Sequence, residues 1–270
     1  MSVAQQAGAM ASPEGGRIEY LEIGQGPPYV VVLGATEGIQ TVGQMARGIR
    51  HLFRRRAERF RVIVVGRPEP IPCDGEPRCL AGDLAVALDT LGVGPAVVEG
   101  ISAGGPVATW LALDRPDLVS RLILTVTFAR ADAHVRRVLE RWMAMAREGR
   151  WMELVLDSLR RGRAQGDPVH DGPLAPPVGL RLAFTPPSSA RFVSLSRGLI
   201  ESDLTPMLSS VGVPTLVIGG ALDAINPPAL VEELAAGIPG ARLLLLPGEG
   251  HNLYEGSAEY QAAVEEFASA

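Results

Sequence analysis

The chain contains no lysine, so all 25 of its basic residues are arginines. This absence excludes a lysine Schiff base and a lysine general base from any chemistry that the protein performs. Only two cysteines are present, Cys73 and Cys79, and two thiols are too few for a framework of disulfides. Both lie in one proline-rich loop, where we expect free thiols and no metal site; a local disulfide is the alternative.

Long apolar runs and basic stripes are also missing. No apolar run approaches the length of a membrane span, and the first residues lack the basic region and apolar core of a secretory signal. The net charge is -5, and the one basic run, at 51–56, is interpreted as the solvated end of a helix. We therefore expect a cytoplasmic protein without a membrane or nucleic-acid partner, preceded by a partly disordered tail over Met1 to Gly16.

What the chain does have is hydrophobic residues, which make up 47% of its 270 positions. Short apolar runs alternate with stretches of helical spacing, and this alternation indicates an α/β fold with a mostly parallel, doubly wound sheet covered on both faces. Strands are predicted at 17–23, 29–33, 60–65, 97–99, 122–126, 215–220 and 242–246, and those at 29–33 and 122–126 are expected to be buried. Helices are predicted at 42–56, 80–91, 106–113, 228–236 and 258–267.

The alternation stops between about Ala129 and Thr205. Apolar residues at helical spacing predict two amphipathic helices near 135–146 and 151–159, and a third near 190–201. A loop rich in proline, glycine and aspartate is predicted at 166–177. We therefore expect a core formed by 1–128 and 207–270, with a helical cap at 129–206 inserted after the sixth strand.

The most informative motif is Gly100-Ile101-Ser102-Ala103-Gly104, which matches G-x-S-x-G between a predicted strand and a predicted helix. A strand, a tight turn with serine at its apex and a helix form the layout of a nucleophile elbow. Glycines suit both ends of the motif, because a Cβ there would clash with the adjoining strand and helix. Ser102 is therefore the predicted nucleophile; the alternative is a plain glycine-rich turn.

A serine nucleophile needs a base to take its proton and an acid to orient that base. His251 and Asp223 each follow a later predicted strand, at the edge of the sheet that also carries Ser102. Their order along the chain, Ser, Asp, His, is that of α/β-hydrolases. Asp132 could serve as the acid instead, but we expect it to cap the next helix.

These motifs, together with Asn226-Pro227-Pro228 after the Asp223 turn, resemble those of the α/β-hydrolase-fold family of serine hydrolases with a helical cap. The resemblance extends from about Gly16 to the C-terminus. It implies a Ser–His–Asp triad, an acyl-enzyme intermediate and no cofactor. By position, it also implies that the backbone N–H groups of Ala35 and Ala103 form the oxyanion hole.

The chain departs from the family pattern around the oxyanion loop. Leu33-Gly34 stands where the family often has His-Gly, and Ile101 stands where it often has a histidine before the nucleophile. Gly66-Arg67-Pro68 replaces a common Asp-x-Arg-Gly stretch.

Several other polar residues are weaker candidates. Thr36 is interpreted as an ordinary loop residue, and Glu37 is expected to point away from the oxyanion hole or to pair with an arginine. The remaining histidines, His51, His134 and His170, are expected at the surface.

The sequence thus predicts a serine hydrolase that cleaves an ester, lactone or thioester of a small, hydrophobic acyl substrate. Hydrolysis of a carbon–carbon bond is an alternative, because that subset of the family uses the same triad. A ligand-binding protein with a vestigial triad is another, motivated by Leu33 and Ile101. The dehalogenase branch is disfavoured, because its nucleophile is an aspartate where this chain has Ser102.

Overall fold

One sheet of eight strands runs through the computed structural model, which describes residues 5–13, 15–162 and 187–270. Its strand order is β1-β2-β4-β3-β5-β6-β7-β8. Strands β3 to β8 are parallel, β2 is antiparallel to β4, and β1 is antiparallel to β2. The strands are β1 (Gln5–Ala11), β2 (Arg17–Ile23), β3 (Pro28–Val32), β4 (Arg61–Val65), β5 (Ala96–Ile101), β6 (Val119–Thr125), β7 (Thr215–Gly220) and β8 (Arg242–Leu246).

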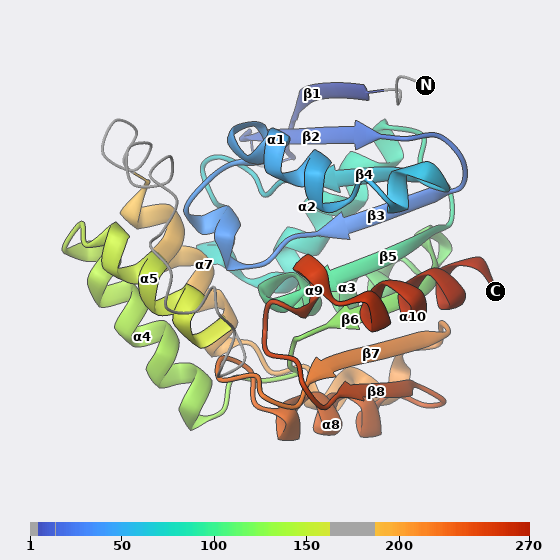
Figure 1. The fold of residues 1–270 in the computed structure, drawn as a ribbon. Helices are drawn as coiled ribbons and strands as arrows, with labels where there is room; N and C mark the ends of the chain where they lie inside the picture. The colour runs from blue at the N-terminus through green and yellow to red at the C-terminus, as the bar shows by residue number, and fades with distance from the viewer. Residues whose placement is uncertain (1–4, 14, 163–186) are drawn as a thin grey trace.

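Helices cover both faces of this sheet (Figure 1). Side chains of α2, α3 and α8 pack in the apolar core on one face, and those of α1 and α10 pack on the other. The α-helices are α1 (Val42–Leu52), α2 (Pro77–Thr90), α3 (Gly105–Asp114), α4 (Ala133–Arg147), α5 (Trp151–Gly162), α7 (Ser189–Glu201), α8 (Pro228–Gly237), α9 (Leu253–Gly256) and α10 (Ala258–Ser269). The short 3-10 helices are η1 (Ala35–Gly38), η2 (Arg56–Glu58), η3 (Cys73–Gly75), η4 (Ser102–Gly104), η5 (Pro116–Leu118) and η6 (Thr205–Ser210).

The central strands have apolar sequences because the sheet is covered on both sides. Every residue of β5 and of β7 is buried, so these strands lack the alternation of a half-exposed strand. The predicted fold class, a mostly parallel sheet with a helical insertion after the sixth strand, is confirmed.

Side chains at the predicted helix starts satisfy backbone N–H groups that lack a partner within the helix. Thr41 and Gln44 form a capping box at α1, and the Ser188 hydroxyl accepts from the N–H of Arg191 at α7. Asp132 accepts from the N–H of Val135, 2.8 Å away, at the start of α4. The prediction that Asp132 caps a helix is therefore confirmed.

The helical insertion lies beyond the carboxyl ends of the parallel strands, where α4, α5 and α7 stand beside the core (Figure 1). Its apolar faces pack together and onto Ala103 of the elbow, with Trp142, Trp151 and Phe192 in the same cluster. The domain limits at 128/129 and 206/207 stay a prediction. The predicted loop at 166–177, including His170, lies outside the described residues.

The prediction of a disordered tail over Met1 to Gly16 was wrong for the part that the structure describes. Residues Gln5–Ala11 form β1, which pairs along its length with β2 from Gln5↔Ile23 to Ala11↔Arg17. Small residues such as Gly8 do not predict a strand, but they fit at this edge of the sheet. A Cβ on Gly8 would lie 2.5 Å from the Tyr20 hydroxyl, so the small residue permits the close approach.

The expectation of free thiols was also wrong, because Cys73 and Cys79 form a disulfide. Three successive residues with positive φ, Cys73 (50°), Asp74 (49°) and Gly75 (77°), turn the chain back, and the two Cα atoms lie 6.4 Å apart. Disulfides are uncommon in reducing compartments, and the cytoplasmic location expected from the sequence stays a prediction.

The basic run at 51–56 is only partly the solvated helix end that was predicted. Helix α1 ends at Leu52, and Arg56 begins the separate turn η2 with only 2% of its surface exposed. Its guanidinium is buried because Glu99 on β5 lies 2.7 Å from it. The local pattern could not reveal this partner, which is distant in sequence.

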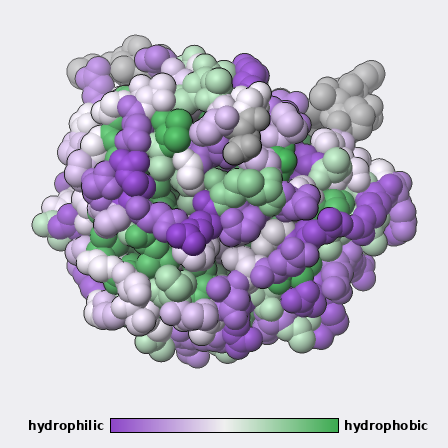
Figure 2. Space-filling model, turned by 180° about the vertical axis from the view of Figure 1, so that it is seen from behind, coloured by the Kyte–Doolittle hydropathy of each residue, from purple (hydrophilic) through white to green (hydrophobic). Residues whose placement is uncertain are grey.

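The molecular surface mixes residue types. Hydrophilic side chains cover much of the face seen from behind, with smaller hydrophobic groups between them (Figure 2). None of the described helices is long and apolar enough to span a bilayer. Across the described ranges, no group of three or more histidine, cysteine or acidic side chains is arranged to hold a metal ion.

Candidate active site

Ser102 stands at a sharp turn between β5 and α3, as the motif predicts. Its φ of 52° lies in the left-handed region, which a serine occupies only under local constraint. The flanking glycines make the turn possible. A Cβ on Gly104 would lie 2.1 Å from the carbonyl oxygen of Val32, and a Cβ on Gly100 would lie 2.7 Å from the Cα of Gly105.

Three predicted residues from distant parts of the chain form one hydrogen-bonded chain. His251 Nε2 lies 2.9 Å from Ser102 Oγ, and His251 Nδ1 lies 2.7 Å from Asp223 Oδ2. These partners assign the proton of a neutral imidazole to Nδ1, which donates to Asp223, while Nε2 accepts from the serine hydroxyl. His251 is 5% exposed and Asp223 4%, so bulk water scarcely competes for these bonds.

Asp223 is held in place by its own backbone turn. Its Oδ1 atom accepts from the N–H groups of Ile225 and Asn226 at 2.8 and 2.9 Å, leaving Oδ2 for His251. Two N–H donors stabilise the charged form of a carboxylate. The acid therefore presents a fixed acceptor to the histidine.

The loops that carry Asp223 and His251 are joined to each other. The N–H of Leu222 donates to the carbonyl of Glu249 at 2.9 Å. Gly220 permits this approach, because a Cβ there would lie 2.4 Å from the same carbonyl oxygen. The spacing between Asp223 and His251 is thus set by the backbone as well as by their own hydrogen bond.

The two predicted oxyanion donors belong to first turns of short helices beside Ser102. Ala35 begins η1, and Ala103 is the second residue of η4. N–H groups in a first helical turn have no partner within the helix, so they can face a ligand. A Cβ on Gly34 would lie 3.1 Å from Ser102 Cβ, which places the η1 loop directly against the serine.

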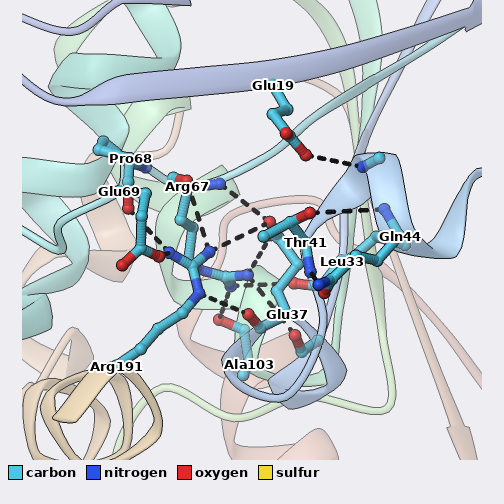
Figure 3. Close-up of polar contacts among 12 residues, drawn as sticks. Glu19, Leu33, Glu37, Thr41, Gln44, Arg67, Pro68, Glu69, Ala103 and Arg191 are labelled. Atoms are coloured by element: carbon cyan, nitrogen blue, oxygen red, sulfur yellow. Dashed lines mark hydrogen bonds and ion pairs between the residues drawn. The ribbon is translucent and has the colours of Figure 1, made fainter. Parts of the chain in front are cut away.

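Glu37 lies in that loop and pairs with an arginine, as expected. Its carboxylate is completely buried and forms an ion pair with Arg67. The Arg67 guanidinium also reaches backbone carbonyls around Ser102, and Arg191 of α7 joins the same group (Figure 3). No local pattern predicts a role for either arginine, and the one signal in the sequence is the departure at Gly66-Arg67-Pro68.

The other candidates lie apart from the chain of Ser102, His251 and Asp223. Thr36 is exposed, and His51 contacts Arg54 near the end of α1. His134 is half-buried rather than at the surface, with Nε2 3.0 Å from the carbonyl oxygen of Ala224. It therefore joins helix α4 to the loop that carries Asp223.

A cavity adjoins Ala35 and Ala103. Its walls are mostly apolar and come from both the core and the insertion, including Leu80, Val107, Phe192, Leu195 and Leu199. The cavity is small, with a volume of about 10 Å³, which is room for about one water molecule.

Fold and site together define an α/β hydrolase. A family model described as the alpha/beta hydrolase fold matches residues 48–165, and a second, described as a TAP-like protein, matches residues 201–269. The chain belongs to the α/β-hydrolase fold family.

Similar proteins include enzymes and part of a much larger protein. An esterase structure from Thermogutta terrifontis is 27% identical with a TM-score of 0.72, covering 97% of both chains. The enol-lactonase from Burkholderia xenovorans LB400 is 24% identical with a TM-score of 0.79, covering 97% of this chain and 100% of that one. Polyketide synthase ThaQ from Burkholderia thailandensis is 29% identical over 94% of this chain, but the match spans only 12% of that protein.

Proposed function

We propose that the protein is a serine hydrolase that cleaves an ester, lactone or thioester through an acyl-enzyme intermediate. The observation that supports this most directly is the unbroken chain from Ser102 Oγ to His251 at 2.9 Å and from His251 to Asp223 at 2.7 Å. A base within hydrogen-bond reach of a serine, itself oriented by a buried carboxylate, is the arrangement that activates the hydroxyl.

In the first half of the proposed reaction, Ser102 Oγ attacks the substrate carbonyl carbon while His251 Nε2 takes the hydroxyl proton. Asp223 stabilises the imidazolium that forms, through its 2.7 Å bond to Nδ1. Collapse of the tetrahedral intermediate breaks the bond to the alcohol or thiol. His251 returns the proton to this leaving group, and the acyl group stays on Ser102.

In the second half, His251 deprotonates a water molecule that attacks the acyl carbon. The new intermediate releases the carboxylic acid, and the proton returns to Ser102. In both halves, negative charge develops on the substrate carbonyl oxygen, where the N–H groups of Ala35 and Ala103 would donate to it. Proton transfer needs no residue other than Ser102, His251 and Asp223.

The substrate class rests on the surroundings of the oxyanion loop. The adjoining cavity is lined mainly by apolar side chains, including Leu80, Phe192 and Leu199. These apolar walls favour a hydrophobic acyl group over a charged one. Similarity to an esterase agrees with ester cleavage.

The test is turnover of aryl esters by the wild type and by Ser102→Ala. We expect the wild type to hydrolyse a short-chain aryl ester and to react with a fluorophosphonate, and Ser102→Ala to lose about 10³-fold or more in kcat. Ser210→Ala, at an exposed serine in η6, is the matched control and should keep full activity. A wild type inactive on both reagents, or an active Ser102→Ala, contradicts the proposal.

The same panel addresses the alternatives from the sequence. A diketone substrate in the panel tests for carbon–carbon bond hydrolysis. Binding of an ester without turnover would instead point to a ligand-binding protein.

A further inference from the structure

Arg67 follows β4, and its guanidinium lies among Leu33, Glu37 and Ala103 (Figure 3). Its side chain is only 6% exposed. One nitrogen, Nη2, donates to the carbonyl of Leu33 at 2.9 Å and lies 3.3 Å from the carbonyl oxygen of Ala103. The other, Nη1, pairs with Glu37 and lies 3.5 Å from the carbonyl oxygen of Gly34. A single side chain therefore contacts both segments that carry the proposed oxyanion donors.

The contact with Gly34 has a specific geometric consequence. The carbonyl of Gly34 and the N–H of Ala35 belong to one planar peptide unit, in which they point in opposite directions. When the carbonyl faces the Arg67 cation, the N–H must face the other way. Gly34 lies against Ser102. The direction of the Gly34 carbonyl therefore sets the direction in which the Ala35 N–H, the proposed oxyanion donor, points.

The Glu37 carboxylate compensates the positive charge of the buried Arg67 guanidinium. Burial lowers the pKa of Arg67 from its usual value, and the Glu37 carboxylate opposes that change. Arginine stays protonated in proteins, so the cation persists. Glu37 Oε1 also accepts from the backbone N–H of Arg67 at 2.9 Å, which fixes the loop after β4 to the oxyanion loop.

Helix α7 of the insertion is tied to the same anchor by Arg191, which is 6% exposed. Its guanidinium donates to the carbonyls of Glu37 at 2.8 Å and Pro68 at 2.9 Å, and pairs with the Glu69 carboxylate. Thus the oxyanion loop and the residues that follow Arg67 are held from the cap as well.

We propose that Arg67 is a positioning residue that orients the peptide unit of Gly34 and Ala35, and holds the turn of Ala103 beside it, for stabilisation of the oxyanion. The inference rests on the proposed hydrolase function. Arg67 also lines the cavity beside Ala35 and Ala103, but the role inferred for it acts through the backbone carbonyls that it holds. Its planar fork presents five N–H donors in a fixed arrangement, which the compact ammonium group of a lysine does not reproduce.

The test compares Arg67→Met and Arg67→Lys with the control Arg56→Met. Arg56 is as deeply buried and also pairs with a carboxylate, but its side-chain hydrogen bonds go to Glu99, Tyr29 and Gln261 rather than to the oxyanion loop. Steady-state kinetics on an aryl ester give kcat and KM for folded protein. Hydrogen–deuterium exchange follows the backbone at 33–38 and 101–105.

For Arg67→Met we expect kcat to fall about 10- to 100-fold with KM within about threefold, because the loss concerns the transition state. Arg67→Lys should recover part of kcat. Arg56→Met should lower stability but keep kcat within about twofold. If Arg67→Met matches the control in kcat, Arg67 has no positioning role, although the hydrolase function stands.

Hydrogen–deuterium exchange distinguishes a failure of the positioning role of Arg67 from a failure of the proposed hydrolase function. A wild type without ester turnover contradicts the function. In that case, faster exchange at 33–38 and 101–105 in Arg67→Met than in the control supports the positioning of the two segments, and equal exchange overturns it.

Discussion

Two buried arginines each pair with a buried carboxylate, but they bond to different parts of the protein. Arg56 pairs with Glu99, donates to the Tyr29 hydroxyl at 2.9 Å, and lies 4.9 Å from the centre of that ring. Arg67 pairs with Glu37 but gives its other donors to main-chain carbonyls.

The Arg56 group is a network of side chains within the core. Glu99 accepts from Thr125 at 2.8 Å and from Tyr260, and the guanidinium of Arg56 also reaches Gln261 at 2.9 Å. Burial raises the pKa of both Tyr29 and Tyr260, so the hydroxyls stay protonated and donate to Glu99. This network joins β3, β5, β6 and α10.

The comparison shows that similar burial and similar pairing can have different consequences. A cation satisfied by side chains stabilises the packing of the elements that carry them. A cation satisfied by backbone carbonyls constrains the orientation of peptide units, and here those units flank Ser102. We therefore expect substitutions in the Arg56 group to lower the free energy of unfolding, and substitutions in the Arg67 group to lower kcat.

The largest effect on stability is expected from Glu99→Gln. This change removes the charge opposite Arg56 and leaves a cation unpaired in the core, which lowers the free energy of unfolding by about 3 kcal/mol. Urea unfolding measures it. The double variant Arg56→Met/Glu99→Gln should lose less than the sum of the single losses, because its core holds no unpaired charge. Strict additivity would show that the pair is not coupled.

Arg191→Met should have the next largest effect. It leaves the carbonyls of Glu37 and Pro68 without their donor and should cost about 2 kcal/mol of stability. Backbone exchange should rise in α7 and η1, with a smaller loss of kcat than in Arg67→Met. Arg197→Met, at an exposed position of the same helix, is the control. Equal exchange in the two variants would argue against an anchor at Arg191.

The smallest change in stability is expected from Gly34→Ala, which alters the oxyanion loop without touching a charge. The added Cβ would lie 3.1 Å from Ser102 Cβ and 3.2 Å from the carbonyl oxygen of Ile101. We expect a stability change within about 1 kcal/mol and a kcat about 3- to 10-fold lower.

Gly48→Ala in α1 is the control for Gly34→Ala, because a Cβ there meets no atom within 4 Å. It should stabilise the helix by about 0.5–1 kcal/mol and leave kcat unchanged. A kcat for Gly34→Ala equal to that of Gly48→Ala would show that the loop tolerates displacement at Gly34.

The sequence predicted the central sheet and the three residues at its carboxyl edge because both follow from local patterns. Apolar runs gave the buried strands, and Ser102, Asp223 and His251 each follow such a run. Parallel strands bring these positions to one edge of the sheet regardless of the details of packing.

What could not be predicted depends on contacts between distant residues. Arg56 stands in a run of arginines, and only Glu99, 43 positions away, explains its burial. Arg67 and Arg191 meet across 124 positions. The β1 strand exists through its pairing with β2, and the disulfide through a turn with positive φ that no residue pattern required.

Arg191 finally sets a condition for building chimeras between hydrolases of this fold. The chain enters and leaves the insertion at two points, but Arg191 adds a non-covalent junction with Glu37, Pro68 and Glu69. A cap grafted from another protein would leave the first two carbonyls buried without a donor unless its last helix brought a cation to the same turn. The insertion is therefore an exchangeable module only together with the core residues to which it is matched.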